Sequence, residues 1–385
     1  MKARHGVTDV IQSHISFIDH HSCPPTHFPN LHVPDAPDII GVRDGPTKYP
    51  VRRPKTHHSD APGPEYEGVP HHRIDTVVEA KPVGSDAAGK LRPQGAAYAY
   101  RHLQARPDHP TFLLLLVTPR FYQVLLSNAN GVIASERTSW DDTLQLLQAY
   151  LYSLYIPPDN HVLFDPTMFW DTTRTGEDSV PEWTIKFHAG QPDEQTFKYA
   201  SLYFYGSPWS RRTAIFKCVQ EDGEEVIIKE YYRSARRRFK EEDVLRHIHA
   251  DGDVPGIVRL RCAEEVVVDG KVLQIGSEEG KDLRTKVRLV LYDSGEPLEA
   301  AKSVNDLLRC FYDAIEGAVL RHVLFIYLLT PAKVHRILLV ERRVLHRDMS
   351  KFNILIYPRW STKTGSKLME GAPPLIDDIL ADEPR

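Results

Sequence analysis

The sequence predicts an α+β fold in which a strand-rich first lobe is followed by helices. From residue 183 onward, short apolar stretches alternate with polar residues and follow one another with turn residues between them. One charged segment with helical periodicity interrupts these stretches, and further helical segments are expected from residue 303. Strands and helices that are grouped in this way, rather than strictly alternating, are typical of α+β domains.

The first 95 residues are predicted to form a largely disordered leader. They are rich in Pro, His, Gly and Asp, and no apolar period persists along them. Three pairs of adjacent histidines could suggest metal binding: His20/His21, His57/His58 and His71/His72. Because the pairs lack the spacing of a metal-binding motif, we expect solvent-exposed side chains instead.

Residues 96–157 are predicted to form a small α+β region. Its apolar runs, 111–118 and 121–127, have the composition of strands, and Asn130-Gly131 predicts a turn into a third strand, 132–139. Ser139 is placed to cap a helix over 140–155, because apolar residues recur there at helical spacing. A polar linker, residues 158–182, is expected to follow.

Residues 183–385 are predicted to form the second domain. Its first lobe is expected to contain several strands, with a turn at Asp222-Gly223: 183–189, 196–206, 213–220, 224–232, 257–268, 271–277 and 286–293. A charged helix is expected over 234–250, between the fourth and fifth of these strands. The basic residues 233–240 are predicted to lie on a solvated face of this helix.

Three pieces of the second domain carry residue types that phosphoryl transfer requires. Gly206 lies in a predicted hairpin turn, and Lys229 ends the apolar strand VIIK. A predicted helix with Glu241 and Glu242 follows. The segment HRDMSKFN then places Asp348 five residues before Asn353. Transfer of phosphate from ATP needs a lysine for the phosphates, a carboxylate that orients it, an aspartate near the attacking hydroxyl, and oxygen ligands for Mg²⁺.

The segment VLHRDMSKFNIL (344–355), in this order after VIIK, resembles the catalytic loop of eukaryotic protein kinases. More narrowly, residues 96–380 resemble the fungal-type protein kinase family. The resemblance implies a protein-kinase-like fold with an incomplete helical second lobe, ATP and Mg²⁺ as cofactors, and a protein substrate with serine or threonine hydroxyls.

The same resemblance implies roles for individual residues. Lys229 and Gly206 match nucleotide-binding positions, and Glu241 matches the helix partner of the lysine, with Glu242 as the alternative. Asp348 matches the catalytic base, and Asn353 matches a Mg²⁺ ligand. The segment LYDSGEPL, residues 291–298, resembles the hinge that contacts adenine.

The sequence departs from the kinase pattern at several places. The hairpin around Gly206 has one glycine where the pattern has three, and Pro208 removes an amide donor. Arg211 and Arg212 could supply charge instead, although solvent-exposed arginines are the simpler interpretation. The apolar segment 318–333 interrupts a kinase-like helix, and we interpret it as foreign to the fold.

The end of the sequence predicts a weak or inactive catalyst. A second metal-binding aspartate is expected after the base, and Asp377 or Asp378 could supply it, but no glycine follows them. We therefore expect this ligand to be absent and ATP turnover by the chain to be unmeasurable. A pseudokinase-like binding module and a small-molecule phosphotransferase remain as alternatives, and HRD rather than HGD favours the protein-kinase branch.

Composition excludes some partners. The formal net charge of −4 gives no electrostatic reason to expect nucleic acid or an acidic membrane as a partner. The most apolar run near residue 325 is much shorter than the roughly 20 residues needed to cross a bilayer. Four widely spaced cysteines (Cys23, Cys218, Cys262 and Cys310) indicate reduced thiols in an intracellular protein of the cytoplasm or nucleus.

Overall fold

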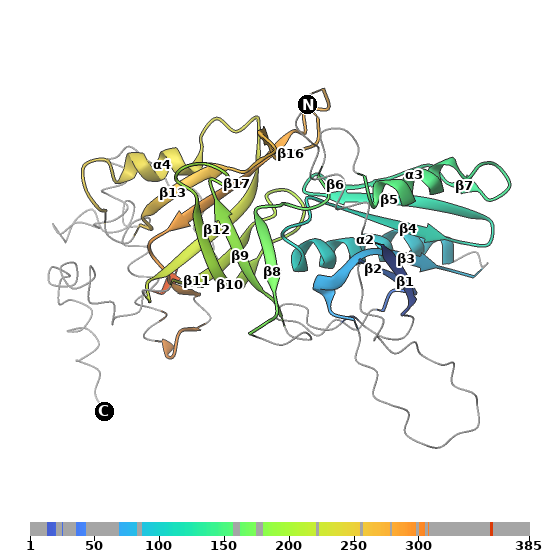
Figure 1. Ribbon diagram of the computed structural model, residues 1–385, viewed down its shortest axis with the longest axis horizontal. Helices are drawn as coiled ribbons and strands as arrows, with labels where there is room; N and C mark the ends of the chain where they lie inside the picture. Colours follow the sequence, from blue (N-terminus) through green and yellow to red (C-terminus); the bar gives the residue numbers. More distant parts are fainter. Residues whose placement is uncertain are drawn as a thin grey trace, which may run out of the picture. The chain divides into compact units, whose positions relative to one another are not determined.

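The described residues form a mixed α+β structure that is rich in strands and has few helices, as the sequence predicts (Figure 1). The computed structural model describes residues 14–20, 25, 36–43, 69–82, 87–156, 162–174, 180–220, 223–254, 257–277, 279–297, 300–304, 307 and 355–356. The chain divides into two compact units, of which the first takes in residues 1–237 and 263–290 and the second residues 238–262 and 291–385.

The first unit contains a seven-stranded sheet. Its strands are β1 (Ile15–Asp19), β2 (Ile39–Arg43), β3 (Ile74–Ala80), β4 (Thr111–Val117), β5 (Phe121–Asn128), β6 (Gly131–Ala134) and β7 (Thr138–Ser139). They are ordered β1-β2-β3-β4-β5-β6, and β7 pairs with β5. Strands β3 and β4 are parallel, and helix α2 (Ala87–Ala105) connects them. The other neighbours are antiparallel, as hairpin connections allow.

Helices α2 and α3 (Gln145–Ser153) cover opposite faces of this sheet (Figure 1). Successive side chains of a strand point to opposite faces, so Leu114 and Leu116 pack with α2 while Leu115 packs with Tyr150 of α3. At Gly95 of α2, an added Cβ atom would lie 2.9 Å from the Leu116 side chain, so glycine lets the helix approach the sheet closely. The short three-residue helix η1 (His71–Arg73) precedes β3.

The first unit also holds most of an eight-stranded sheet. Its strands are β8 (Met168–Asp171), β9 (Glu182–Phe187), β10 (Gln195–Tyr205), β11 (Ala214–Val219), β12 (Glu225–Ser234), β13 (Leu260–Glu265), β16 (Gln274–Ile275) and β17 (Arg284–Leu291). They are ordered β13-β17-β12-β11-β10-β9-β8, with β16 on β17. Phe216 and Ile228 are cross-strand partners with no solvent exposure, and Trp183 contacts Phe216 edge-on. A separate hairpin is formed by β14 (Val267–Val268) and β15 (Lys271–Val272).

The second unit has few described elements. Helix α4 (Glu241–Ile248) carries three acidic residues in its first turn, where they stabilise the helix dipole. Strand β18 (Glu296–Pro297) pairs with β19 (Leu355–Ile356), with Glu296 opposite Ile356. Within the described residues, no helix has the length and apolar character needed to span a membrane.

The prediction of a largely disordered leader is wrong for the described parts of residues 1–95. These parts contain β1, β2 and β3, which are five to seven residues long, and the start of α2. The three strands are separated by Pro- and His-rich stretches, so no apolar period extends across them. The partner of each strand is distant in sequence: β1 pairs with β2, β2 with β3, and β3 with β4. Pairing of this kind leaves little trace in the local sequence.

Part of the predicted linker, residues 158–182, is also structured. Strand β8 adds to the second sheet through β9, and the Asp165 side chain is completely buried. Because Asp165 bonds to residues of the second sheet, this segment belongs to the core of the first unit rather than to a polar connection.

Two predicted helices are shorter in the structure. Helix α3 starts at Gln145 without a side-chain cap, and the hydroxyl of Ser139 instead accepts a hydrogen bond from the Asp141 amide. Helix α4 starts at Glu241, so the basic residues 233–240 precede the helix rather than lie on its face. Four sequence predictions lie wholly or mostly outside the described residues: the helix 303–317, the segment 318–333, the loop with Asp348 and Asn353, and the pair Asp377 and Asp378.

Histidines around the first sheet are buried rather than solvated, which corrects the expectation for His20, His71 and His72. His102 and His109 are buried beside them, with Nε2 of His102 2.9 Å from Nδ1 of His109. Burial lowers the pKa of His20 to about 4 and that of His71 to about 3. Among the described residues, no three His, Cys, Asp or Glu side chains are grouped so as to hold a metal ion.

Acidification is therefore expected to destabilise the first unit. Between pH 6.5 and 4 the unfolded chain protonates His20 and His71 while the folded chain does not, so the free energy of unfolding falls as pH falls. Burial raises the pKa of Asp75, which takes up its proton in the folded state and offsets part of this slope. We expect a loss of about 2 kcal/mol between pH 7 and pH 5, measured by urea unfolding. The half-exposed His188 provides the control: H188Q should keep the slope, and equal stability at both pH values would contradict the prediction.

Candidate active site

Lys229 lies in the middle of β12, opposite Ile215 of β11. It is partly exposed, whereas its neighbour Glu230 is buried with charged partners on the other face of the sheet. Side chains alternate along a strand, so Lys229 and Tyr231 share one face while Glu230 and Tyr232 share the other. The predicted nucleotide-binding lysine therefore lies on one face of the sheet, and the buried side chains of Glu230 and Tyr232 lie on the other.

Two cations lie over the ring of Tyr231. The Lys229 ammonium is 5.8 Å from the ring centroid, and the Arg211 guanidinium carbon is 4.8 Å from it. Tyr231 itself is almost completely buried. Cations attract the negative face of an aromatic ring, so this ring holds both positive groups on the lysine face of the sheet.

Gly206 begins the connection from β10 to β11, as the predicted hairpin requires. Its N–H donates to the Thr213 carbonyl at 2.7 Å, and its carbonyl accepts from the Gln104 side chain of α2 at 3.0 Å. An added Cβ atom at Gly206 would meet only ordinary contacts, the nearest at 3.5 Å. This glycine is therefore not required by sterics within the described residues.

The connection 206–213 is held against the first sheet. The Ser210 N–H donates to the Ala129 carbonyl at 2.6 Å, and the Trp209 indole N–H donates to the Ser127 hydroxyl at 3.3 Å. The Trp209 ring also packs edge-on against Tyr100 of α2, with centroids 5.2 Å apart. In a glycine-rich nucleotide loop the backbone covers the phosphates, so these contacts are a departure from that arrangement.

Arg212 anchors this connection and is not the solvent-exposed arginine that the sequence suggests. It is buried, and its guanidinium donates to four backbone carbonyls at the end of α2 and just beyond it: Leu103, Arg106, His109 and Pro110. Carbonyls at a helix C-terminus lack partners within the helix and carry partial negative charge. Arg212, which lies between two strands of the second sheet, therefore supplies hydrogen-bond donors to the backbone carbonyls at the end of α2.

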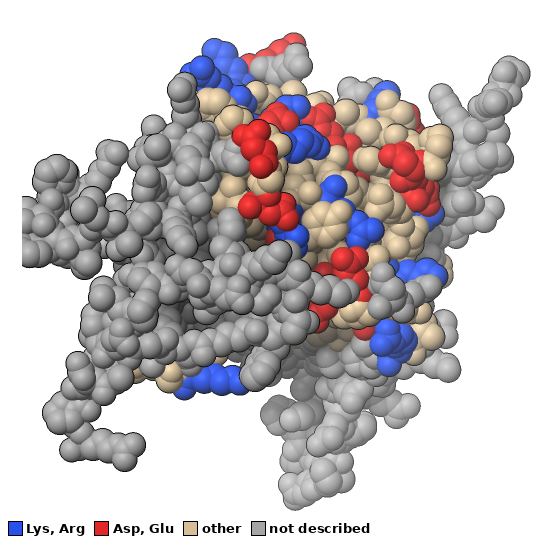
Figure 2. Space-filling model, turned by 90° about the vertical axis from the view of Figure 1, so that its left-hand side faces the viewer, with Lys and Arg blue, Asp and Glu red and all other residues tan. Residues whose placement is uncertain are grey.

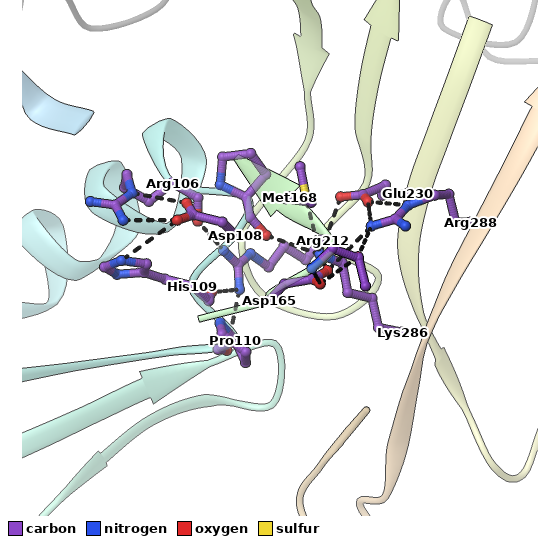
Figure 3. Close-up of polar contacts among 12 residues, drawn as sticks. Arg106, Asp108, His109, Pro110, Asp165, Met168, Arg212, Glu230, Lys286 and Arg288 are labelled. Atoms are coloured by element: carbon purple, nitrogen blue, oxygen red, sulfur yellow. Dashed lines mark hydrogen bonds and ion pairs between the residues drawn. The ribbon is translucent and has the colours of Figure 1, made fainter. Parts of the chain in front are cut away.

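A buried group of charged side chains joins the two sheets of the first unit (Figure 3). Arg288 has no exposure, and it bonds Glu230 at 2.6 Å and Glu264 at 2.8 Å. Lys286 bonds Asp165 at 2.6 Å and also donates to the Pro107 carbonyl at 3.3 Å. Charges that are buried together in this way need mutual partners, because each alone would lose its hydration.

The charges in this group hold one another ionised. Burial alone would raise the pKa of Asp165, but Lys286 and Arg288 outweigh it and leave that pKa below its usual value. Burial alone would lower the pKa of Lys286, but Asp165 and Glu230 outweigh it and leave that pKa raised. The group lies on the face of β12 opposite Lys229, so it has a structural position rather than a catalytic one.

Of the two glutamates proposed to partner the lysine, Glu242 is the more buried. Glu242 shares the buried face of α4 with Leu245 and Ile248, three and six residues further on. Glu241 is partly exposed at the first helical position. Lys229 and α4 belong to different units, so the pairing of this lysine with either glutamate stays a prediction.

The hinge-like segment 291–298 is fixed within the second unit. The Arg259 guanidinium forms a two-pronged contact with Asp293, at 3.0 Å from Nε and 2.8 Å from Nη2, and the Tyr292 N–H donates to the Arg259 carbonyl. The hydrogen bonds that the guanidinium donates to the Asp293 carboxylate raise the pKa of Arg259. The segment then forms β18, whose partner β19 starts two residues after Asn353. Leu355 and Ile356 are thereby paired with the end of the hinge-like segment.

Charged side chains on the described surface are mixed in sign. Figure 2 shows one face of the molecule, on which Lys and Arg side chains lie beside Asp and Glu side chains. A small pocket beside Gly206 has room for about one water molecule.

Several residues that define the first unit were not singled out by sequence reasoning. They are Asp165, Glu230, Lys286 and Arg288. Lys286 and Arg288 alternate with apolar residues along β17, a pattern that normally marks a solvated strand face. Asp165 lies in a polar stretch of sequence that gives no indication of burial. Its role is apparent only from its contacts in the structure.

A hairpin with a glycine, a lysine on the next strand, an acidic helix, a hinge-like segment and an HRD motif follow one another in the order of the kinase signature. The class of protein is therefore kinase-like. The chain matches the fungal protein kinase family over residues 74–285 and 277–370, more than half of its length, and it belongs to that family. The match begins with β3, so the first sheet is in large part a family feature. A comparison with curated proteins found no match.

Proposed function

We propose that the protein transfers the γ-phosphoryl group of ATP to serine or threonine hydroxyls of a protein substrate. The observation that carries this proposal is the β18–β19 pairing, which joins the hinge-like segment to the strand directly after Asn353. Adenine recognition and phosphate chemistry must lie side by side in a kinase, and this pairing supports that arrangement.

Each predicted residue has a defined part in this reaction. Lys229 would hold the phosphates of ATP and Asn353 would hold Mg²⁺, which would supply positive charge for phosphoryl transfer. The substrate hydroxyl oxygen attacks the γ-phosphorus as the bond to the bridging oxygen of ADP breaks, and Asp348 accepts the hydroxyl proton. Glu242, on the buried face of α4, is the better candidate than Glu241 to orient the lysine.

A nucleotide-binding module without catalysis is the second candidate. It is favoured by the connection 206–213, which has a single glycine and is tied to the first sheet through Ser210 and Arg212. A loop held in this way offers few backbone amides to phosphate. The small-molecule phosphotransferase alternative has no comparable support.

The cellular setting forms part of the proposal. Cys218 is a free thiol, and burial raises its pKa to about 11, which suits a reduced thiol in the cytoplasm or nucleus. We propose protein substrates rather than nucleic acid or membrane partners.

Transfer of labelled γ-phosphate from Mg²⁺-ATP to a generic protein substrate tests the proposal. Label on serine and threonine, with none on tyrosine, would support the proposal, and it would overturn the expectation, drawn from the segment with Asp377 and Asp378, that the chain has no measurable ATP turnover. Binding of ATP without transfer would establish the second candidate function, and absence of both would reject both proposals.

Replacing Lys229 with methionine is expected to weaken ATP binding about tenfold, because a charge-assisted hydrogen bond to phosphate is lost. Adenosine binding should be unchanged. Isothermal titration with both ligands measures the effect. Lys217 on β11 provides a matched control, since it is a partly exposed strand lysine paired with Glu225 at 3.1 Å. An equal effect of K217M and K229M on ATP would contradict the assigned role.

A further inference from the structure

The connection between β10 and β11 places two adjacent arginines on opposite faces of the second sheet. The Tyr232 N–H donates to the Arg211 carbonyl at 2.7 Å, so the connection continues beside β12 at this point. Arg212 points into the interior, where its guanidinium lies 5.7 Å from the Tyr232 ring centroid and bonds the end of α2. Arg211 lies on the other face, over Tyr231.

Arg212 fixes the position of its neighbour. Its backbone is in the left-handed region, with φ of 45°, and its side chain donates to backbone carbonyls just beyond the end of α2, including those of Arg106 and His109. Ser210 on the other side of Arg211 is also in this region, with φ of 74°, and its N–H is bound to Ala129. Non-glycine residues adopt this conformation only when their surroundings impose it. The Arg211 backbone is therefore fixed from both sides.

The side chain of Arg211 consequently lies over the same ring as Lys229, that of Tyr231. Both cations lie within 6 Å of one ring centroid, at 4.8 Å for Arg211 and 5.8 Å for Lys229. Positively charged side chains that lie over one ring can contact the same phosphate group. A guanidinium also presents parallel N–H donors that match phosphate oxygens.

We propose that Arg211 is a second phosphate-binding side chain, which acts with Lys229 on the phosphates of the nucleotide. This inference rests on the proposed function, because it deepens the same nucleotide site. Side-chain charge takes the place of the backbone amides that a glycine-rich loop supplies. The loop contacts to the first sheet are then a means of presenting Arg211, and they are compatible with nucleotide binding.

Titration of the full chain with ATP, ADP and adenosine, in the presence of Mg²⁺, tests this role. Replacement of Arg211 by glutamine should weaken ATP and ADP binding about tenfold and leave adenosine binding unchanged. R211K should recover part of the lost affinity, because it keeps the charge but not the paired donors. In addition, the ATP affinity of the wild type should fall more steeply with salt than that of R211Q.

The outcomes separate this inference from the proposed function. If R211Q binds ATP as the wild type does while K229M is weakened, the inference is overturned and the nucleotide site remains. If the wild type binds no nucleotide, both are overturned. A variant that fails to fold is recognised by a lower urea midpoint and by loss of adenosine binding. In that case R211K is compared with the wild type instead. The control is K217Q, which removes a cation from the same sheet face and should leave binding of all three ligands unchanged.

Discussion

Replacing Arg288 with methionine is expected to lower the free energy of unfolding by about 3–5 kcal/mol. The guanidinium is completely buried and contacts three carboxylates, at 2.6 Å for Glu230, 2.8 Å for Glu264 and 3.2 Å for Asp165. Methionine has a similar length but no charge. The carboxylates would then remain buried with much less compensation, and this cost exceeds the gain from an apolar side chain.

Urea unfolding of the two proteins, followed by circular dichroism and tryptophan fluorescence, measures this loss. The matched control is K217M, which removes a partly exposed ion pair to Glu225 and should change stability by less than about 1 kcal/mol. If R288M were no less stable than K217M, the buried charges would not hold the first unit together.

A double replacement tests whether the charges act as one group. Removing Glu230 together with Arg288, as E230L/R288M, should cost less than the sum of the single changes, because R288M alone leaves the buried Glu230 carboxylate with one cationic partner, Lys286, in place of two. The expected coupling is about 1–3 kcal/mol. Strict additivity would show that Arg288 acts through its contacts with the Lys186 carbonyl and Thr167 instead.

The strands with regular alternation were predictable from sequence. The runs beginning at Thr111 and Phe121, and those of β9 to β12, agree with the expected ranges to within about two residues at most of their ends. In these segments, local alternation and turn residues such as Asn130-Gly131 agree with the tertiary pairing. Sequence reasoning succeeds where the two levels give the same answer.

The strands before residue 80 and the buried charges were not predictable in the same way. β2 owes its place to β1 and β3, which lie about 20 and 30 residues away along the chain. Helix α2 contains Pro93 and Gly95, which normally interrupt helices, yet Gly95 is needed for close packing on Leu116. Asp165 and Arg288 are charged residues in positions that only mutual pairing makes acceptable.

The candidate site was predicted unevenly. The sequence placed Lys229 on a strand and Gly206 at a hairpin connection, and the structure has both there. It selected Glu241 over Glu242 from apolar spacing, whereas burial on α4 favours Glu242. It treated Arg211 and Arg212 alike, because the sequence does not show how a turn with left-handed residues at Ser210 and Arg212 directs the two side chains to different partners.

Replacing Asp348 with alanine is expected to reduce the rate of phosphoryl transfer about 10²–10⁴-fold. The carboxylate is the proposed acceptor of the substrate hydroxyl proton, and alanine has no group that takes its place. The KM for ATP should change little, because the proposed phosphate-binding groups are Lys229, Arg211 and Mg²⁺, whereas the proposed role of Asp348 is at the attacking hydroxyl. Initial rates of labelled phosphate transfer at varied ATP concentration separate the two parameters.

The pattern of kinetic effects across variants decides whether this division of roles is right. D348A should lower kcat at constant KM, whereas K229M and R211Q should raise the KM for ATP. The control is D193A, which should change neither parameter, because Asp193 is an exposed carboxylate that pairs with the nearby His188. A D348A protein with unchanged kcat would remove Asp348 from the chemistry. A D348A protein with a raised KM and normal kcat would assign Asp348 to nucleotide binding, and the proton acceptor would then have to be sought elsewhere on the HRDMSKFN loop.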